Sequence, residues 1–179
     1  MLAPSVARVN AVLQLANERP LRPYTITSRL GDGWLHNKTV SALRTLERIG
    51  IVRPVQRQRH TEYEPNPESP YAEVAHQVAL IDLGIHDLLP ASSQVMAIYV
   101  HGSVAEGSAN PDSDLDVLLI GKIDPREARA ALAPVERMLG RSLDVTVRSA
   151  AEVRDAIAAG DAFVTEVLDR GVRVWGIWR

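Results

Sequence analysis

Three short apolar runs restrict the fold of this chain more than any other feature. Residues 95–100 and 115–120 each have the length and composition of a buried strand, and residues 143–147 form a third such run. Helical patterns and a closing strand accompany them, at 125–139, 150–159, 162–168 and 171–175. Because strands here alternate with helices, the sequence predicts an α/β (α+β) layer.

A cluster of prolines indicates where this layer begins. Pro65, Pro67 and Pro70 lie close together, and a proline can neither donate to a strand ladder nor continue a helix. We therefore expect one domain over residues 1–68 and a second over residues 69–179. In the second domain, residues 71–89 have the pattern of a long connecting helix.

The composition excludes several classes of protein. With 46% hydrophobic and 23% charged residues, the chain has the balance of an ordinary globular protein rather than a disordered one. Its apolar runs are far shorter than the roughly 20 residues of a membrane span, and its first residues lack the apolar core of a signal peptide. The absence of cysteine excludes disulfides and Cys-ligated zinc. We expect a cytoplasmic protein with no membrane partner.

The net charge of -2 conceals an uneven distribution. Residues 1–60 hold ten Lys and Arg against three Asp and Glu, a balance of +7. Residues 61–90 hold six acids and no Lys or Arg, and residues 91–179 hold thirteen acids against ten Lys and Arg. A basic first third predicts a module that binds an anionic partner.

The segment between the first two apolar runs carries the clearest chemical signal. A predicted strand ends at Gly102-Ser103, and the next opens with Asp114 and Asp116, which alternation places on one face. Paired carboxylates repel each other unless a hard divalent cation lies between them. A helix that begins at Gly102-Ser103 would offer free N–H groups to a phosphate. Asp144, on the third apolar run, is the candidate third ligand of a two-metal site.

Each of these residues also has a simpler interpretation. An Asp-x-Asp pair before an apolar strand is often a solvated strand end, but the upstream Gly-Ser turn and the third acid favour a nucleotide site. His101 adjoins the turn and could touch phosphate or acceptor, although such a histidine more often packs at a strand end. We therefore expect the His101 side chain to pack at the end of its strand.

The Gly102-Ser103 turn followed by Asp114-x-Asp116 resembles the signature of the DNA polymerase β-like nucleotidyltransferase superfamily. The minimal nucleotidyltransferase group, related to the kanamycin nucleotidyltransferase type, is the most similar, over about residues 71–179. The resemblance implies a small mixed sheet with flanking helices and an NTP, ATP in the first instance, as substrate or ligand. It assigns nucleotide binding to Gly102, Ser103 and Ser113, and Mg²⁺ (or Mn²⁺) and catalysis to Asp114, Asp116 and Asp144.

One residue departs from this pattern. Minimal nucleotidyltransferases often carry an arginine just before the loop glycine, where this chain has Glu106. A negative side chain facing a triphosphate weakens its binding, whereas one exposed to solvent is screened. Glu106 therefore bears on how efficient catalysis is, or whether it occurs, more than on the fold.

The basic first domain resembles a winged helix-turn-helix of the bacterial regulator type. Its pattern predicts a first helix from residue 6 that ends near residues 19–20, further helices at 25–30 and 37–49, and then a hairpin with strands at 51–56 and 60–64. In the third helix Val40, Leu43, Leu46 and Ile49 form the expected buried stripe. The resemblance implies double-stranded DNA as partner, through a recognition helix and a wing. The expected contacts are Lys38, Thr39, Ser41 and Arg44 on the helix and Arg53, Arg57, Arg59 and His60 on the wing. The alternative is a basic module that packs on its neighbour or binds a protein.

These features together predict a DNA-binding protein that transfers a nucleotidyl group from an NTP to an acceptor. Two alternatives remain open: a transcriptional regulator whose nucleotidyltransferase fold only senses nucleotide, and an antitoxin-like protein paired with a small helical toxin. A homodimer is a further expectation, since winged-helix regulators commonly dimerise.

Overall fold

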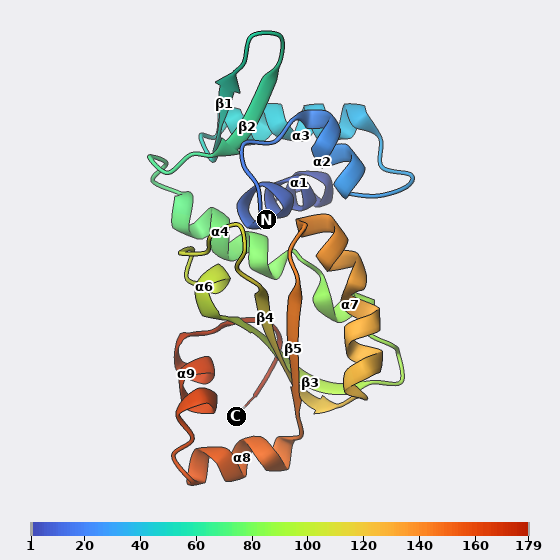
Figure 1. The fold of residues 1–179 in the computed structure, drawn as a ribbon, viewed down its shortest axis with the longest axis vertical. Helices are drawn as coiled ribbons and strands as arrows, with labels where there is room; N and C mark the ends of the chain where they lie inside the picture. The colour runs from blue at the N-terminus through green and yellow to red at the C-terminus, as the bar shows by residue number, and fades with distance from the viewer. Residues whose placement is uncertain (1, 179) are drawn as a thin grey trace. The chain divides into compact units, whose positions relative to one another are not determined.

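A computed structural model describes residues 2–178, which divide into two compact units. The first comprises the chain up to Leu83 together with Arg137–Gly140, and the second comprises Gly84–Glu136 and the chain from Arg141. Small sheets with flanking helices in both units confirm the predicted mixed α/β class (Figure 1). Within residues 2–178, no helix combines the length and apolarity that crossing a bilayer requires.

The first unit contains helices followed by an antiparallel hairpin and a further helix. In chain order they are α1 (Pro4–Leu15), α2 (Pro23–Arg29), α3 (His36–Arg48), β1 (Val52–Gln56), β2 (Thr61–Pro65) and α4 (Ala72–Ile81). The hairpin pairs Val52 with Pro65 and Gln56 with Thr61. Buried side chains of α1, α2 and α3 form one apolar cluster, which includes Val9, Leu13, Ile26, Leu43 and Leu46.

The predicted long helix over residues 71–89 is wrong. Helix α4 ends at Ile81, and a separate short helix, α5 (Ile85–Leu88), follows. Gly84 between them has a φ of 65°, a left-handed conformation that no continuous right-handed helix contains. Helix α4 packs on α1, where the Asn10 side-chain nitrogen donates to the Ala75 carbonyl at 3.0 Å, so α4 belongs to the first unit.

The second unit is built on a four-stranded mixed sheet in the order β5-β4-β3-β6. Its strands are β3 (Gln94–His101), β4 (Leu115–Lys122), β5 (Leu143–Arg148) and β6 (Val172–Gly176). Strands β4 and β5 are parallel, and the other neighbouring pairs are antiparallel. The observed strands agree with the apolar runs from which they were predicted.

Helices lie on both faces of this sheet (Figure 1). The short α6 (Gly102–Ala105) follows β3, and α7 (Pro125–Leu139) connects β4 to β5. Helices α8 (Ala150–Ala158) and α9 (Ala162–Arg170) cover the other face from α7. Val153, Val164 and Val167 on α8 and α9 pack against Tyr99 and Leu118 of the sheet. This cluster buries the middle of the sheet and leaves the end of the same face, where β4 begins, to polar residues.

Candidate active site

Three polar residues form one row across the sheet at the start of β4. His101 on β3 is the pairing partner of Asp116 on β4, and Asp116 is the pairing partner of Asp144 on β5. Residues that pair directly project to the same face, so the three side chains share one side. The next row contains Tyr99 and Leu118, which belong to the core beneath α8 and α9. The polar row therefore borders that core.

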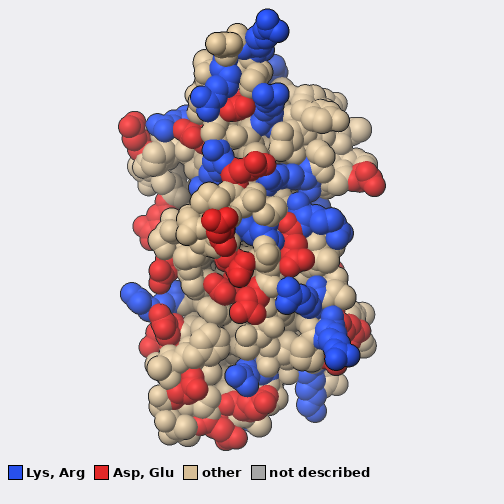
Figure 2. Space-filling view, viewed as in Figure 1, with Lys and Arg blue, Asp and Glu red and all other residues tan. Residues whose placement is uncertain are grey.

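Asp114 adds a third carboxylate to this end of the sheet. It lies two residues before Asp116, so alternation directs it to the same face, and its side chain is exposed. Burial raises the pKa of Asp116, His101 opposes that rise, and the charges of Asp144 and Asp114 add to it. Figure 2 shows Asp and Glu side chains gathered on this face, over the region of α6 and β4.

The three carboxylates lie at the same end of the sheet but do not form a complete metal-binding site. Among residues 2–178, no three His, Cys, Asp or Glu side chains are arranged so that they could hold a metal ion. The predicted set of Asp114, Asp116 and Asp144 thus shares one end of the sheet, and a cation would have to draw the three together.

The Gly102-Ser103 turn lies directly against the central acid of the row. Gly102 begins α6 with a φ of 69°, and a Cβ added to it would overlap Oδ2 of Asp116. The turn is closed by a hydrogen bond of 2.9 Å from the Ser108 N–H to the Ser103 carbonyl. Glycine is required here by both its backbone conformation and the close approach of the carboxylate.

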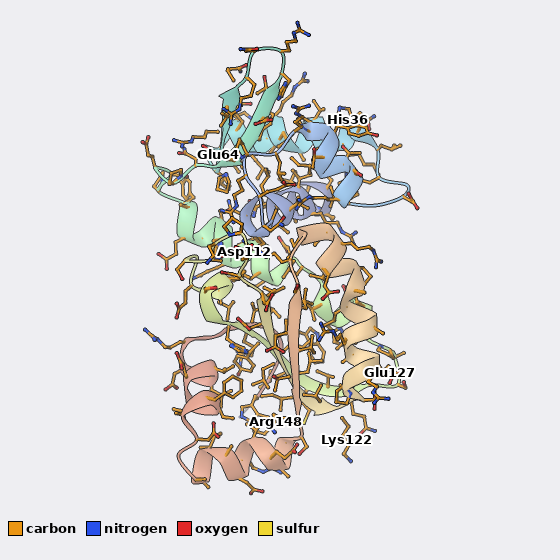
Figure 3. The ribbon with its side chains drawn as sticks, in the orientation of Figure 1. His36, Glu64, Asp112, Lys122, Glu127 and Arg148 are labelled. Carbon is orange, nitrogen blue, oxygen red and sulfur yellow. The ribbon has the colours of Figure 1, made fainter. Side chains whose placement is uncertain are left out.

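Ser113, also predicted to bind nucleotide, is engaged within the loop that precedes β4. Its hydroxyl oxygen accepts from the Asn110 N–H at 3.0 Å, and the Asn110 side-chain oxygen accepts from the Asp112 N–H at 2.8 Å. These bonds fold residues 110–113 into a tight turn immediately before Asp114; Figure 3 labels Asp112 in it.

Helix α9 contributes residues to this site that were not predicted from the sequence. The Phe163 ring stands edge-on to the His101 ring, with centroids 5.4 Å apart, and is 40% exposed. Burial lowers the pKa of His101, while Asp116, Asp144 and Glu166 on α9 oppose that change. His101 thus lies among three carboxylates rather than only packing at a strand end. The spacing of residues in α9 does not indicate that this helix packs near β3. The only sequence signal that His101 belongs to the site is its position directly before Gly102.

The predicted DNA contacts lie in the first unit, and one needs correction. Lys38, Ser41 and Arg44 are exposed along α3, as expected. Thr39 is fully buried, and its hydroxyl accepts from Thr27 at 2.9 Å and from the Trp34 ring nitrogen at 3.0 Å. The buried face of α3 consists of Thr39, Ala42, Leu43 and Leu46. It confirms Leu43 and Leu46 of the predicted stripe, whereas Val40 is only partly buried and Ile49 is exposed. Because Thr39 points into the unit, it is removed from the expected contacts.

The hairpin carries arginines that differ in their partners. Arg53 pairs with Glu64 at 2.8 Å and Arg57 with Glu62 at 3.1 Å, and hydrogen bonds from His60 and Arg57 lower the pKa of Glu62. Arg59 is exposed and makes no ion pair within residues 2–178. Figure 2 shows Lys and Arg side chains gathered about this hairpin.

Acidic residues between positions 61 and 83, the glutamates of β2 among them, reduce the charge of the first unit. The unit holds eleven Lys and Arg against eight Asp and Glu, a balance of +3 instead of the +7 counted over residues 1–60. Its positive charge is therefore a local feature of α3 and the hairpin tip.

The candidate active site lies within a range of residues that is similar to a known protein family. Residues 86–173 match the family model of the nucleotidyltransferase domain, a range that includes the turn and the three acids. This supports the predicted nucleotidyltransferase domain in the C-terminal part of the chain. No curated protein sequence matches the chain.

Two solved structures show partial similarity. One is a toxin–antitoxin with AMP-PNP, with 18% identity and a TM-score of 0.37 over 55% of this chain and 71% of that one. The other is a candidate nucleotidyltransferase from Sulfolobus solfataricus, with 17% identity and a TM-score of 0.31 over 62% of this chain and 92% of that one.

Proposed function

We propose that the second unit transfers a nucleotidyl group from an NTP, ATP in the first instance, to an acceptor with the help of Mg²⁺ or Mn²⁺. One observation carries the proposal: the Gly102 backbone lies against Asp116, which pairs in register with Asp144. A phosphate-binding turn and metal-binding carboxylates thereby meet at one point. This combination suits phosphoryl chemistry on a nucleotide.

The carboxylates fit a hard divalent cation. Asp114, Asp116 and Asp144 supply only oxygen donors, which Mg²⁺ and Mn²⁺ prefer. The charges of Asp144 and Asp114 already raise the pKa of Asp116, and a cation between the three would remove this repulsion. When bound, such a cation would polarise the α-phosphate and neutralise charge on the departing pyrophosphate.

The residues of the chain itself bind the triphosphate and accept the proton of the acceptor. Gly102 and Ser103 hold the triphosphate so that an oxygen or nitrogen of the acceptor attacks the α-phosphorus. The new bond to that phosphorus forms as its bond to the bridging oxygen of the β-phosphate breaks, and pyrophosphate leaves. The proton of the acceptor passes to the exposed carboxylate of Asp144, at the open end of the row.

Transfer of label from α-³²P-ATP tests this proposal. The chain is incubated with Mg²⁺ and cell lysate as the source of acceptor, and we expect a labelled product together with pyrophosphate. Asp144→Asn should abolish both, whereas Asp155→Asn, an exposed aspartate on α8, should abolish neither. Absence of pyrophosphate with every NTP would contradict the proposal.

DNA binding by the first unit is a second candidate function. It is supported by the exposed side chains of Lys38, Ser41 and Arg44 on α3 and by the arginines of the hairpin that follows α3. In a winged helix-turn-helix, the helix reads bases and the wing touches phosphates. Duplex binding that depends on these residues would support it.

The two functions can also combine in a sensor that does not catalyse. NTP must then bind the DNA-competent and DNA-free states with different affinity, because equal affinity shifts no equilibrium. ATP would change duplex affinity in a gel-shift titration, and no pyrophosphate would form. Pyrophosphate release that Asp144→Asn stops would instead identify the enzyme.

A further inference from the structure

A buried arginine connects the two segments that carry the acids of the candidate active site. Arg141 lies two residues before β5 and is 5% exposed. One of its terminal nitrogens donates to the carbonyls of Asn110 and Ser113, both at 2.7 Å. Burying a guanidinium is costly unless hydrogen bonds compensate it, so these bonds must form for the folded loop to persist.

The position of Arg141 gives it influence over both sides of the site. The two carbonyls belong to the tight turn of residues 110–113, and Asp114 follows immediately. Asp144 is three residues beyond Arg141 along the chain. A backbone bond of 2.9 Å from the Leu115 N–H to the Ser142 carbonyl joins the same two segments. Arg141 therefore ties the loop before β4 to the beginning of β5.

We propose that Arg141 is a positioning residue, whose hydrogen bonds to the Asn110–Ser113 turn hold Asp114 beside the beginning of β5, so that a cation can draw it together with Asp144. This inference rests on the proposed function, because it concerns the same carboxylates. The two carbonyls that Arg141 binds lie outside the Gly102-Ser103 turn. Arg141 acts on metal-assisted nucleotide binding and leaves metal-free contacts with the phosphates unchanged.

The variant Arg141→Met tests the inference, because it removes the guanidinium and retains an apolar stem of similar length. Calorimetry measures ATP affinity with Mg²⁺ and with EDTA, and the ratio of the two affinities reports the contribution of the metal. We expect this ratio to fall about tenfold, the order of one charge-assisted hydrogen bond, with the EDTA affinity unchanged. Arg141→Lys, which keeps a cation and donors in case the methionine variant does not fold, should recover part of the ratio.

Two controls separate positioning from general stability. Arg148→Met removes an exposed arginine from the far end of β5, and Val153→Ala weakens the core beneath α8. Neither should change the affinity ratio. Hydrogen exchange of residues 107–116 should accelerate in Arg141→Met and remain unchanged in both controls.

The outcomes distinguish failure of this inference from failure of the proposed function. A wild-type chain whose ATP affinity is the same in Mg²⁺ and EDTA contradicts the proposed function, and the positioning role falls with it. A wild-type ratio that Arg141→Met leaves intact overturns the positioning role alone. Unchanged exchange of the loop in Arg141→Met also overturns it, because the turn would then not depend on Arg141.

Discussion

The carboxylate of Asp116 lies so close to the backbone of Gly102 that no space remains for a β-carbon at residue 102. A Cβ on residue 102 would overlap Oδ2 of Asp116 and lie 3.2 Å from its Cγ. Because Gly102 also has a φ of 69°, any other residue there meets both backbone strain and a carboxylate. This contact couples the turn proposed to hold phosphate to the acid proposed to hold the metal.

Gly102→Ala should therefore damage the site more than the fold. The left-handed conformation alone costs about 1–2 kcal/mol in a non-glycine residue. Displacement of Asp116 should in addition lower nucleotidyl transfer at least about tenfold, since catalysis falls steeply when catalytic groups shift by an ångström. Thermal unfolding and pyrophosphate release measure the two effects.

Gly160→Ala is the matched control for this substitution. Gly160 has a φ of 70° in the same unit, but a Cβ there would meet nothing within 4 Å. Gly102→Ala should lose at least as much stability as Gly160→Ala, because only residue 102 also meets a carboxylate, and only Gly102→Ala should lose activity. Equal activity in both would show that the contact between Gly102 and Asp116 has no role in the reaction.

The raised pKa of Asp116 predicts how stability depends on pH in the metal-free protein. The folded state binds a proton at Asp116 more tightly than the unfolded state, so the ionised carboxylate costs stability. This cost is absent below the ordinary carboxyl pKa of 3.8, develops as pH rises toward the raised pKa, and is complete above it.

Asp116→Asn should consequently stabilise the chain in EDTA at pH 7. We expect a rise in Tm of roughly 1–3 °C, allowing for solvent screening of a partly buried group, and a smaller rise near pH 4. Thermal unfolding at both pH values measures it, with Asp155→Asn as the control for loss of a carboxylate. A lower Tm for Asp116→Asn at pH 7 would contradict the assigned repulsion.

The elements of the second unit were accessible from sequence because apolar runs and alternation are local signals. The runs at 95–100, 115–120 and 143–147 became β3, β4 and β5, and the pairing of Asp116 with Asp144 follows from two parallel strands in register. The break at Gly84 was missed because the apolar pattern continues across it, and pattern alone does not report a left-handed φ.

Residues placed by tertiary packing could not be predicted in the same way. Thr39 was expected to contact DNA because α3 resembles a recognition helix, but a Thr27–Thr39–Trp34 hydrogen-bond network buries it. Phe163 contacts His101, and the charge of Glu166 raises the pKa of His101, from a helix about sixty residues further along the chain. Arg141 is a charged residue in the core, a position that composition and periodicity disfavour.

The charge of Glu106 provides another test of the phosphate turn. Glu106 follows α6 directly and is exposed. If it faces the phosphates, Glu106→Arg should tighten ATP binding roughly two- to fivefold, the range of an exposed charge interaction. Asp155→Arg on α8 makes the same change in charge away from the turn and should leave affinity unchanged. Equal calorimetric affinities of Glu106→Arg and wild type would show that Glu106 faces solvent.

We predict that substitutions of different hairpin arginines weaken DNA binding to different degrees. Each neutralised phosphate contributes a slope of about −0.9 to log K against log salt, so Arg59→Ala should weaken binding to all duplexes and reduce that slope by about one. Arg57→Ala should act in the same direction but more weakly, because Glu62 already neutralises Arg57. Substitution of Ser41 or Arg44 should instead alter sequence preference. Gel shifts at several salt concentrations measure this, and failure to bind any duplex would favour a protein-binding role.

Uptake of Mn²⁺ tests the central claim most directly, because it reports the carboxylates without requiring the acceptor. In an EPR titration with AMP-PNP present, the signal of free Mn²⁺ should fall as the wild-type chain binds one or two ions. The double variant Asp116→Asn/Asp144→Asn should leave that signal at the level of nucleotide alone, while Asp155→Asn should behave as wild type. Equal Mn²⁺ uptake by the double variant and the wild type would contradict a metal-dependent nucleotide site at the start of β4.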